Sequence, residues 1–373
     1  MEFEGLEELA GQSARQFVTD GEGPITKNDN AYELSCKLIE NGDMFFALVS
    51  KYDDVLADVF HKRGYKAGDT LKLILPFLKA HGATNRKMID LSKANILLVP
   101  GAERTMRFVH EFMQSFIVST SYEHYVSAVC EAIGFPLENV YCTKVNMDET
   151  KMEEWEQLVL KNYEKEIALM PMIEIPEGAR GVEDFDPRDQ RTIRRLDEIF
   201  WHDMTDLPSY QLILEVNPVG GEEKAASIVD ICRKTGASLE DTIYVGDSIT
   251  DVQAFRLVKD GGGLAVSFNG NSYAVREADL AVMSSDTVTT SVLAETFYKG
   301  GKDSVMELIE NWNMEHIKKT GIVHEYLVKE LARVFPEQLP VVAKVSADNM
   351  PQLSQLSSKF RKTVRGEAIG TLG

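Results

Sequence analysis

Cysteine is scarce in this sequence, and long apolar runs are absent. The four cysteines, Cys36, Cys130, Cys142 and Cys232, are scattered among 373 residues without metal-ligand spacing. Such a distribution favours small buried thiols in a reducing compartment. The acidic N-terminus lacks the apolar core of a secretion signal, and no run approaches the length of a membrane span. We therefore expect a soluble, cytoplasmic protein with no membrane partner.

Positive charge is also in short supply. The chain has 40 Lys and Arg against 59 Asp and Glu, a formal net charge of −19. This excess of negative charge argues against a nucleic-acid backbone or an anionic membrane as the main partner. It also repels anionic substrates at long range. Any phosphate site therefore needs local positive charge from a metal, a lysine or a helix N-terminus.

The rest of the sequence alternates apolar, strand-like runs with amphipathic helical stretches. This alternation predicts an α/β fold in which a parallel sheet is covered on both faces. We expect the strands at 17–18, 115–121, 140–143, 210–216, 241–245, 264–268 and 280–283.

Two long stretches contain no strand-like run and are interpreted as insertions. Residues 43–97 have helical spacing, and residues 148–208 hold two charged helices around a Pro- and Glu-rich connector. The core then comprises 1–42, 98–147 and 209–295. Residues 296–373 form a mostly helical C-terminal extension, whose last polar residues, 358–373, are expected to be loose.

The segment from Arg15 to Pro24 predicts a brief strand that delivers Asp20 and Glu22 into a glycine-rich turn. A carboxylate at the carboxyl end of a buried strand is well placed for chemistry in an open α/β sheet. Taken alone, the segment favours a plain turn, because Asp-Gly is a common turn dipeptide.

A second acid pair, Asp247 and Asp251, follows the strand predicted at 241–245. Four-residue spacing can put one carboxylate at the strand end and the other in the first helical turn, facing the same point. Two such acids repel each other unless a divalent cation lies between them, and hard oxygen ligands suit Mg²⁺. The alternative makes Asp247 a helix N-cap and Asp251 a solvated first-turn acid.

Two further side chains can serve a phosphate. Ser119 lies near the end of a predicted strand, where its hydroxyl can bond a phosphate oxygen beside the next helix, or simply cap that helix. Lys224 lies near the start of a predicted helix, where a cation opposes the helix dipole unless an anion compensates it. Taken singly, Lys224 is equally a surface lysine.

In this order, the four features resemble the four motifs of the haloacid dehalogenase (HAD) superfamily. The segment GGGLAVSFNGNSYAVREADLAVM, residues 261–283, resembles its phosphoserine-phosphatase-like members. Residues 20–30 resemble archaeal members labelled energy-converting hydrogenase A subunit R. The resemblance implies a Rossmann-like doubly wound parallel sheet, a helical cap at 43–97 and a second helical insertion or lid at 148–208.

The same resemblance implies a Mg²⁺-dependent phosphomonoester hydrolase that acts on a small phosphorylated metabolite. Asp20 would attack phosphorus and become an aspartyl-phosphate. Mg²⁺ would be held by Asp20, the backbone carbonyl of Glu22 and Asp247, with Asp251 nearby. Ser119 and Lys224 would orient and neutralise the phosphoryl oxygens.

Glu22 departs from the family pattern, which has Asp as the acid/base two residues after the nucleophile. The extra methylene moves the carboxyl group by about a bond length, and misplacement of that order can cost much of the rate. Three interpretations follow: an active hydrolase, a phosphotransferase or mutase, and a non-catalytic or weakly active accessory subunit of a larger, hydrogenase-related complex. A homodimer is equally open.

Overall fold

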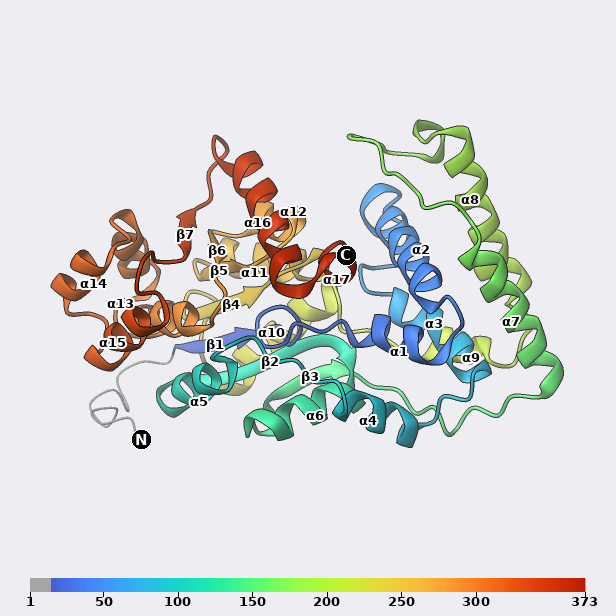
Figure 1. The fold of residues 1–373 in the computed structure, drawn as a ribbon, viewed down its shortest axis with the longest axis horizontal. Coiled ribbons are helices and arrows are strands. Elements are labelled where there is room, and N and C mark those ends of the chain that lie inside the picture. The colour runs from blue at the N-terminus through green and yellow to red at the C-terminus, as the bar shows by residue number, and fades with distance from the viewer. Residues whose placement is uncertain (1–14, 373) are drawn as a thin grey trace.

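The computed structural model describes residues 15–372, so the polar lead-in expected over residues 1–14 lies outside the described residues. A seven-stranded sheet occupies the centre of the molecule (Figure 1), with the strand order β3-β2-β1-β4-β5-β6-β7. The strands are β1 Gln16–Thr19, β2 Gln114–Tyr122, β3 Val140–Thr143, β4 Thr242–Gly246, β5 Leu264–Phe268, β6 Leu280–Met283 and β7 Val341–Lys344.

Seventeen α-helices surround this sheet in the described part of the chain. They are α1 Asn30–Leu38, α2 Gly42–Asp54, α3 Thr70–Ala80, α4 Asn85–Lys93, α5 Ala102–Phe112, α6 Glu123–Ile133, α7 Glu154–Ala168, α8 Pro187–Glu198, α9 Tyr210–Glu215, α10 Glu222–Thr235, α11 Val252–Asp260, α12 Ser272–Glu277, α13 Val288–Glu310, α14 Met314–Thr320, α15 Glu325–Val334, α16 Met350–Arg365 and α17 Glu367–Gly370. None of them is both long and apolar enough to span a bilayer.

The sheet is doubly wound because its strands are apolar on both faces. On β1, Phe17 packs into the cluster built with α5, α6 and α13, whereas the next residue, Val18, packs with α10 and α11. On β4, Ile243 and Tyr244 divide between the two clusters in the same way. Alternate side chains of a strand point to opposite faces, so helices are needed on both sides. This confirms the predicted fold class, a Rossmann-like parallel α/β sheet with helical insertions.

Strand β1 lies at the point where the strand order reverses. It pairs in parallel with β2 on one side and with β4 on the other, and Thr19 is in register with Ile117 and Val245. In open α/β sheets the crevice at such a reversal, outside the carboxyl ends of the strands, is the usual binding site. The residues that follow β1 and β4 therefore meet there.

The two helical insertions pack together on one side of the sheet (Figure 1). They share a single apolar cluster that also includes residues of α1 and α9. Phe200 stacks on Tyr52 with ring centroids 5.9 Å apart and meets Phe77 edge-on at 6.1 Å. The Tyr52 hydroxyl donates to Asp197 at 2.5 Å and accepts from the Trp201 indole at 2.8 Å. We call this joint unit the helical body.

Removing the Phe200 ring is expected to destabilise the helical body by about 3–5 kcal/mol, because Phe200→Ala leaves a cavity at a fully buried position. Urea denaturation measures the loss. Leu169→Ala is the matched control, since that side chain is 85% exposed, and it should change the free energy of unfolding by less than about 0.5 kcal/mol. Equal effects of the two substitutions would contradict a shared core.

The strand predicted at 210–216 is wrong, because these residues form α9. Leu212, Ile213 and Val216 are buried in the cluster of the helical body, whereas Leu214 is 65% exposed. Burial at spacings of three and four is a helical pattern. The short apolar run did not distinguish helix from strand.

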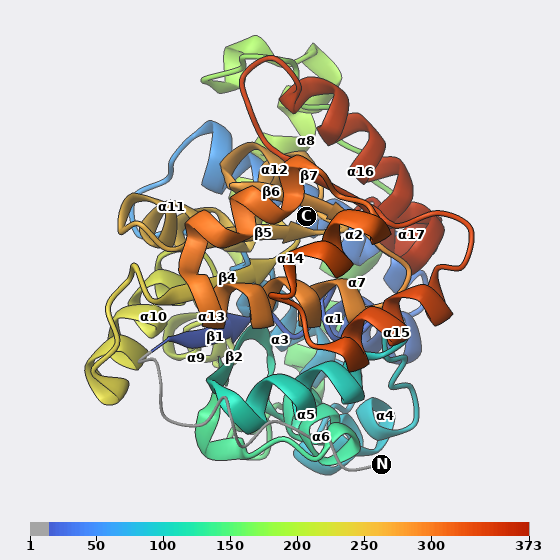
Figure 2. The same ribbon diagram turned by 90° about the vertical axis from the view of Figure 1, so that its left-hand side faces the viewer.

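The expectation of a loose C-terminal tail is also wrong. Residues 350–365 form α16, whose buried face carries Leu353, Ser354, Ser357 and Arg361. The Ser357 hydroxyl donates to the Gly270 carbonyl oxygen at 2.6 Å, which fixes the helix against the core. The preceding strand β7, not predicted, adds an antiparallel edge to β6. Figure 2 shows α16 and α17 beside the sheet, with α13, α14 and α15 in front of it.

Candidate active site

Asp20 follows β1 directly, and its backbone N–H still donates to the Val245 carbonyl of β4 at 2.8 Å. The turn after it brings Gly23 against Asp247. Gly23 has φ +92°, and a Cβ there would lie 2.2 Å from the Asp247 carboxyl carbon. Only glycine tolerates both the left-handed conformation and this approach. The glycine-rich turn predicted from sequence thus brings the two strand ends together.

Three carboxylates meet at this crevice. Asp20, Asp247 and Asp251 are all buried, and each offers an oxygen within 4.8 Å of the others. Their donor set is oxygen alone, which suits a hard divalent cation such as Mg²⁺. Among residues 15–372, no group donates a hydrogen bond to the Glu22 carbonyl oxygen, the fourth predicted ligand.

Lys224 is fully buried and joins two of these acids. Its ammonium group donates to Asp20 at 2.5 Å and to Asp251 at 2.7 Å. Asp251 also accepts from the Tyr244 hydroxyl at 2.5 Å and from the backbone N–H groups of Asp247 and Ser248, each at 2.9 Å. Lys224 is therefore neither a surface residue nor a free cation, and Asp251 is not a solvated first-turn acid.

Burial and neighbouring charges shift the pKa values of the groups in this cluster in different directions. Burial, reinforced by Asp251 and Asp247, raises the pKa of Asp20 to about 7 despite its contact with Lys224. Burial also opposes the charge on Asp251, but Lys224 and the Tyr244 hydroxyl outweigh it and lower the pKa of Asp251. The negative charges of Asp20 and Asp251 likewise overcome burial and raise the pKa of Lys224.

Ser119 lies beside the turn that follows Asp20. A Cβ on Gly21 would be 3.1 Å from the Ser119 hydroxyl oxygen. That oxygen accepts from the backbone N–H of Ser121 at 3.3 Å, and β2 continues to Tyr122. The strand thus extends one residue beyond the predicted 115–121 at each end. Ser119 does not cap the following helix, which starts at Glu123.

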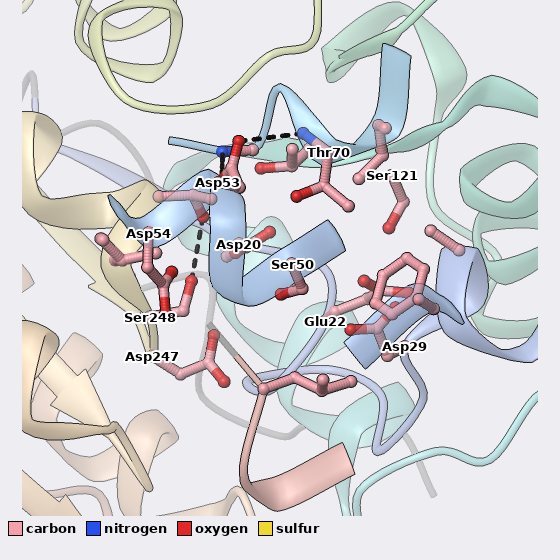
Figure 3. A pocket seen from close by; sticks show the side chains of 18 of the residues that line it. Asp20, Glu22, Asp29, Ser50, Asp53, Asp54, Thr70, Ser121, Asp247 and Ser248 are labelled. Atoms are coloured by element: carbon pink, nitrogen blue, oxygen red, sulfur yellow. Dashed lines mark hydrogen bonds between the residues drawn. The ribbon is translucent and has the colours of Figure 1, made fainter. Parts of the chain in front are cut away.

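Glu22 points away from the three-carboxylate cluster. Its Oε1 accepts from the backbone N–H of Asn30 at 2.7 Å, at the start of α1. In Figure 3 it lies beside Asp29, on the opposite side of the cavity from Asp54 and Ser248. Burial, followed by the nearby charge of Asp29, raises the pKa of Glu22 well above its usual range. This shift favours the protonated, neutral form of Glu22.

A cavity of about 90 Å³ lies above these residues, walled by the core, the insertion at 43–97 and α16 (Figure 3). The core contributes Asp20, Glu22 and Asp247, and the insertion at 43–97 contributes Asp53, Asp54 and Thr70, among others. A cavity of this size suits a small ligand.

The comparisons with known proteins give one extensive likeness. The chain is similar to a gene product of Archaeoglobus fulgidus, with 28% identity and a TM-score of 0.77 over 97% of this chain and 99% of that chain. This likeness extends over the insertions and the C-terminal extension.

More distant matches are to phosphoserine phosphatase in its apo form, with 14% identity and a TM-score of 0.42, and to a phospho-aspartyl intermediate analogue of phosphoserine phosphatase, with 14% identity and 0.43. They cover 74% of this chain and 96% of each of those chains. No protein-family model and no curated protein matches. The predicted hydrogenase-subunit label has no support among these findings.

Two arginines that line the cavity were not predicted from the sequence. Arg361 and Arg365 project from α16 onto the carboxylate of Asp247, where Arg365 Nη1 lies 2.9 Å from Oδ2 and Arg361 donates to the same oxygen. A signal was present, because Leu353, Ser357, Arg361 and Arg365 recur every four residues, as on one face of a helix. The polar composition of the tail concealed it.

Proposed function

We propose that the protein is a Mg²⁺-dependent phosphomonoester hydrolase of the HAD type that uses Asp20 as its nucleophile. One observation carries the proposal. Asp20 and Asp247, on neighbouring strands at the reversal of the sheet, present buried carboxylates to one cavity, and Lys224 bridges Asp20 to Asp251. The motif order of the HAD superfamily supports the same conclusion.

Mg²⁺ would be held by Asp20, the Glu22 carbonyl oxygen and Asp247, and it would supply charge that screens the phosphoryl group from the nucleophile. One Asp20 oxygen attacks phosphorus, and the bond from phosphorus to the leaving oxygen breaks. Lys224 keeps Asp20 oriented, and the Ser119 hydroxyl donates to a phosphoryl oxygen. Asp20 thereby becomes an aspartyl-phosphate.

Glu22 is the proton donor when the ester bond breaks and the proton acceptor when water hydrolyses the aspartyl-phosphate. Its raised pKa favours the protonated form, which can donate its proton to the departing oxygen of the ester. The carboxylate that results then takes a proton from a water molecule. The oxygen of this water attacks phosphorus, the acyl phosphate bond breaks, and phosphate and free Asp20 are regenerated.

One observation favours a second candidate, a weakly active or accessory protein. The carboxyl group of Glu22 is engaged by the N-terminus of α1 and must turn from Asn30 to reach a leaving group. A screen of phosphomonoesters with Mg²⁺ and with EDTA separates the two candidates. The hydrolase releases phosphate from at least one ester in Mg²⁺ and from none in EDTA. The accessory protein releases none in either condition.

Mg²⁺ binding is expected to tighten about tenfold between pH 6 and pH 8. The pKa of Asp20 is raised to about 7, so below pH 7 the cation must displace a proton, and above it the carboxylate is already free. Isothermal titration calorimetry in buffers of different ionisation enthalpy measures both the affinity and the proton release. Asp20→Asn removes this titration, so its residual affinity should vary less with pH. A wild-type affinity that is the same at both pH values would contradict the assignment of Asp20 as a ligand.

A further inference from the structure

Helix α16 brings two guanidinium groups into the cavity from the C-terminal extension. The side chains of Arg361 and Arg365 are only 3% and 4% exposed, and both line the cavity. They are the only cationic side chains lining it within residues 15–372. Arginine is seldom buried without a partner for each of its donors.

All three nitrogen atoms of Arg365 donate hydrogen bonds within the protein. Its Nε donates to the Lys27 carbonyl oxygen at 3.1 Å, its Nη2 donates to the Asn28 carbonyl oxygen, and its Nη1 donates to Asp247 Oδ2 at 2.9 Å. These contacts tie α16 to the segment after the first acid pair. Arg365 is therefore a positioning residue, which fixes the helix and one oxygen of Asp247.

Arg361 uses one of its three nitrogen atoms. Its Nη1 donates to Asp247 Oδ2 and to the Asp247 carbonyl oxygen, the latter at 3.2 Å. Its buried Nε has no hydrogen-bond partner, and no described residue accepts from its Nη2. Leaving a buried donor unpaired is unfavourable, and more so for a charged group. The adjacent N–H groups of Nε and Nη2 form the planar edge that binds a carboxylate or phosphate through two parallel hydrogen bonds.

The acids of the cavity wall are engaged within the protein. Asp53 accepts from the Tyr65 hydroxyl at 2.6 Å and from two backbone N–H groups, and Asp54 pairs with Lys51 at 2.6 Å. Asp29 caps α1 by accepting from Tyr32 at 2.9 Å. The unpaired N–H groups of Arg361 Nε and Nη2 are thus the part of the cavity wall that can recognise a charged group, and they recognise an anion.

We propose that Arg361 binds a second anionic group, a carboxylate or a phosphate, on the leaving part of the substrate. The proposal rests on the hydrolase function above. In that mechanism the transferred phosphoryl group already has Ser119 and the metal as partners, and Lys224 orients its nucleophile. Arg361, on the Asp247 side of the cavity, meets the next charged group along the substrate. The small cavity limits that substrate to a compact phosphorylated acid or a compact bisphosphate.

Matched esters test this proposal. Glycerol 3-phosphate has a neutral leaving part, 3-phosphoglycerate adds a carboxylate, and glycerol 1,3-bisphosphate adds a phosphate. We expect the wild-type protein with Mg²⁺ to favour at least one of the two doubly anionic esters by about tenfold or more in kcat/KM. The favoured ester shows which anion Arg361 takes.

Arg361→Lys retains the positive charge beside Asp247 but lacks the planar edge, so it should bring that preference close to one. Lys359→Gln removes an exposed charge from the same helix and should retain the wild-type preference. A wild-type protein without preference for either anionic ester would overturn the proposal. So would an Arg361→Lys variant that loses the same factor on all three esters. The wild-type comparison remains decisive if Arg361→Lys fails to fold.

If the wild-type protein hydrolyses none of the esters, the hydrolase function fails and Arg361 is tested by binding alone. Calorimetry with 3-phosphoglycerate, glycerol 1,3-bisphosphate and glycerol 3-phosphate then gives the same comparison. Tighter binding of a doubly anionic ester that disappears in Arg361→Lys supports the recognition role. Equal binding of all three esters overturns it.

Discussion

Asp20→Asn is expected to abolish phosphate release, with a fall of at least about 10⁴-fold in kcat, because the amide cannot attack phosphorus. Asparagine has nearly the same shape as aspartate and can still accept the hydrogen bond that Gly21 N donates to Asp20 Oδ1 at 2.6 Å. Loss of activity would then reflect lost chemistry and not a lost fold. Phosphate release under saturating Mg²⁺ measures the effect.

The control for this substitution is Asp260→Asn, at an exposed position at the end of α11. It removes the same charge from the same residue type and should leave kcat within about twofold. Circular dichroism of the two variants should overlay that of the wild-type protein. A fully active Asp20→Asn variant would exclude the covalent mechanism.

Lys224→Met is expected to lower the free energy of unfolding by about 3–5 kcal/mol at pH 8 in the absence of metal. The substitution leaves Asp20 and Asp251 buried with no cation between them. Without Lys224 the pKa values of both carboxyl groups rise, so the folded protein is penalised wherever these carboxylates must ionise. The penalty is therefore small near pH 5 and grows as the pH rises.

Urea denaturation in EDTA at pH 5 and pH 8 measures this effect. Lys234→Met is the control, because Lys234 lies on the same helix but is exposed, with Asp230 at 2.8 Å. An exposed pair contributes about 0–1 kcal/mol. A Lys224→Met penalty of the same size at both pH values would show that packing, and not charge, accounts for the loss.

The residues around β1 and β4 were predictable because short-range signals determine them. Asp20 and Asp247 each follow an apolar run and precede a glycine-rich or helical turn, and parallel strand ends lie on one edge of the sheet. The orientation of Glu22 was not predictable. It depends on the N–H of Asn30, whose position is determined by how α1 packs in the helical body.

The arginines of α16 were out of reach for a different reason. Arg361 is 114 residues from Asp247 along the chain, and Arg365 is 118 residues away. Nothing local connects a polar tail to a motif that distant. The helical spacing of its buried face predicts a helix, but only the packing of α16 on the core shows which surface that helix covers.

The shared core of the helical body has a consequence for how the protein is made. Helices α2 and α3 leave the ribosome well before α7, α8 and α9, with which they bury their apolar side chains. During synthesis the apolar surface of the first insertion therefore remains exposed while the central strands β2 and β3 are made. Such transiently exposed surface is prone to aggregation and is a natural target for chaperones. The part of the cavity wall that comes from the insertion at 43–97 is therefore packed in place only after α7, α8 and α9 have been synthesised.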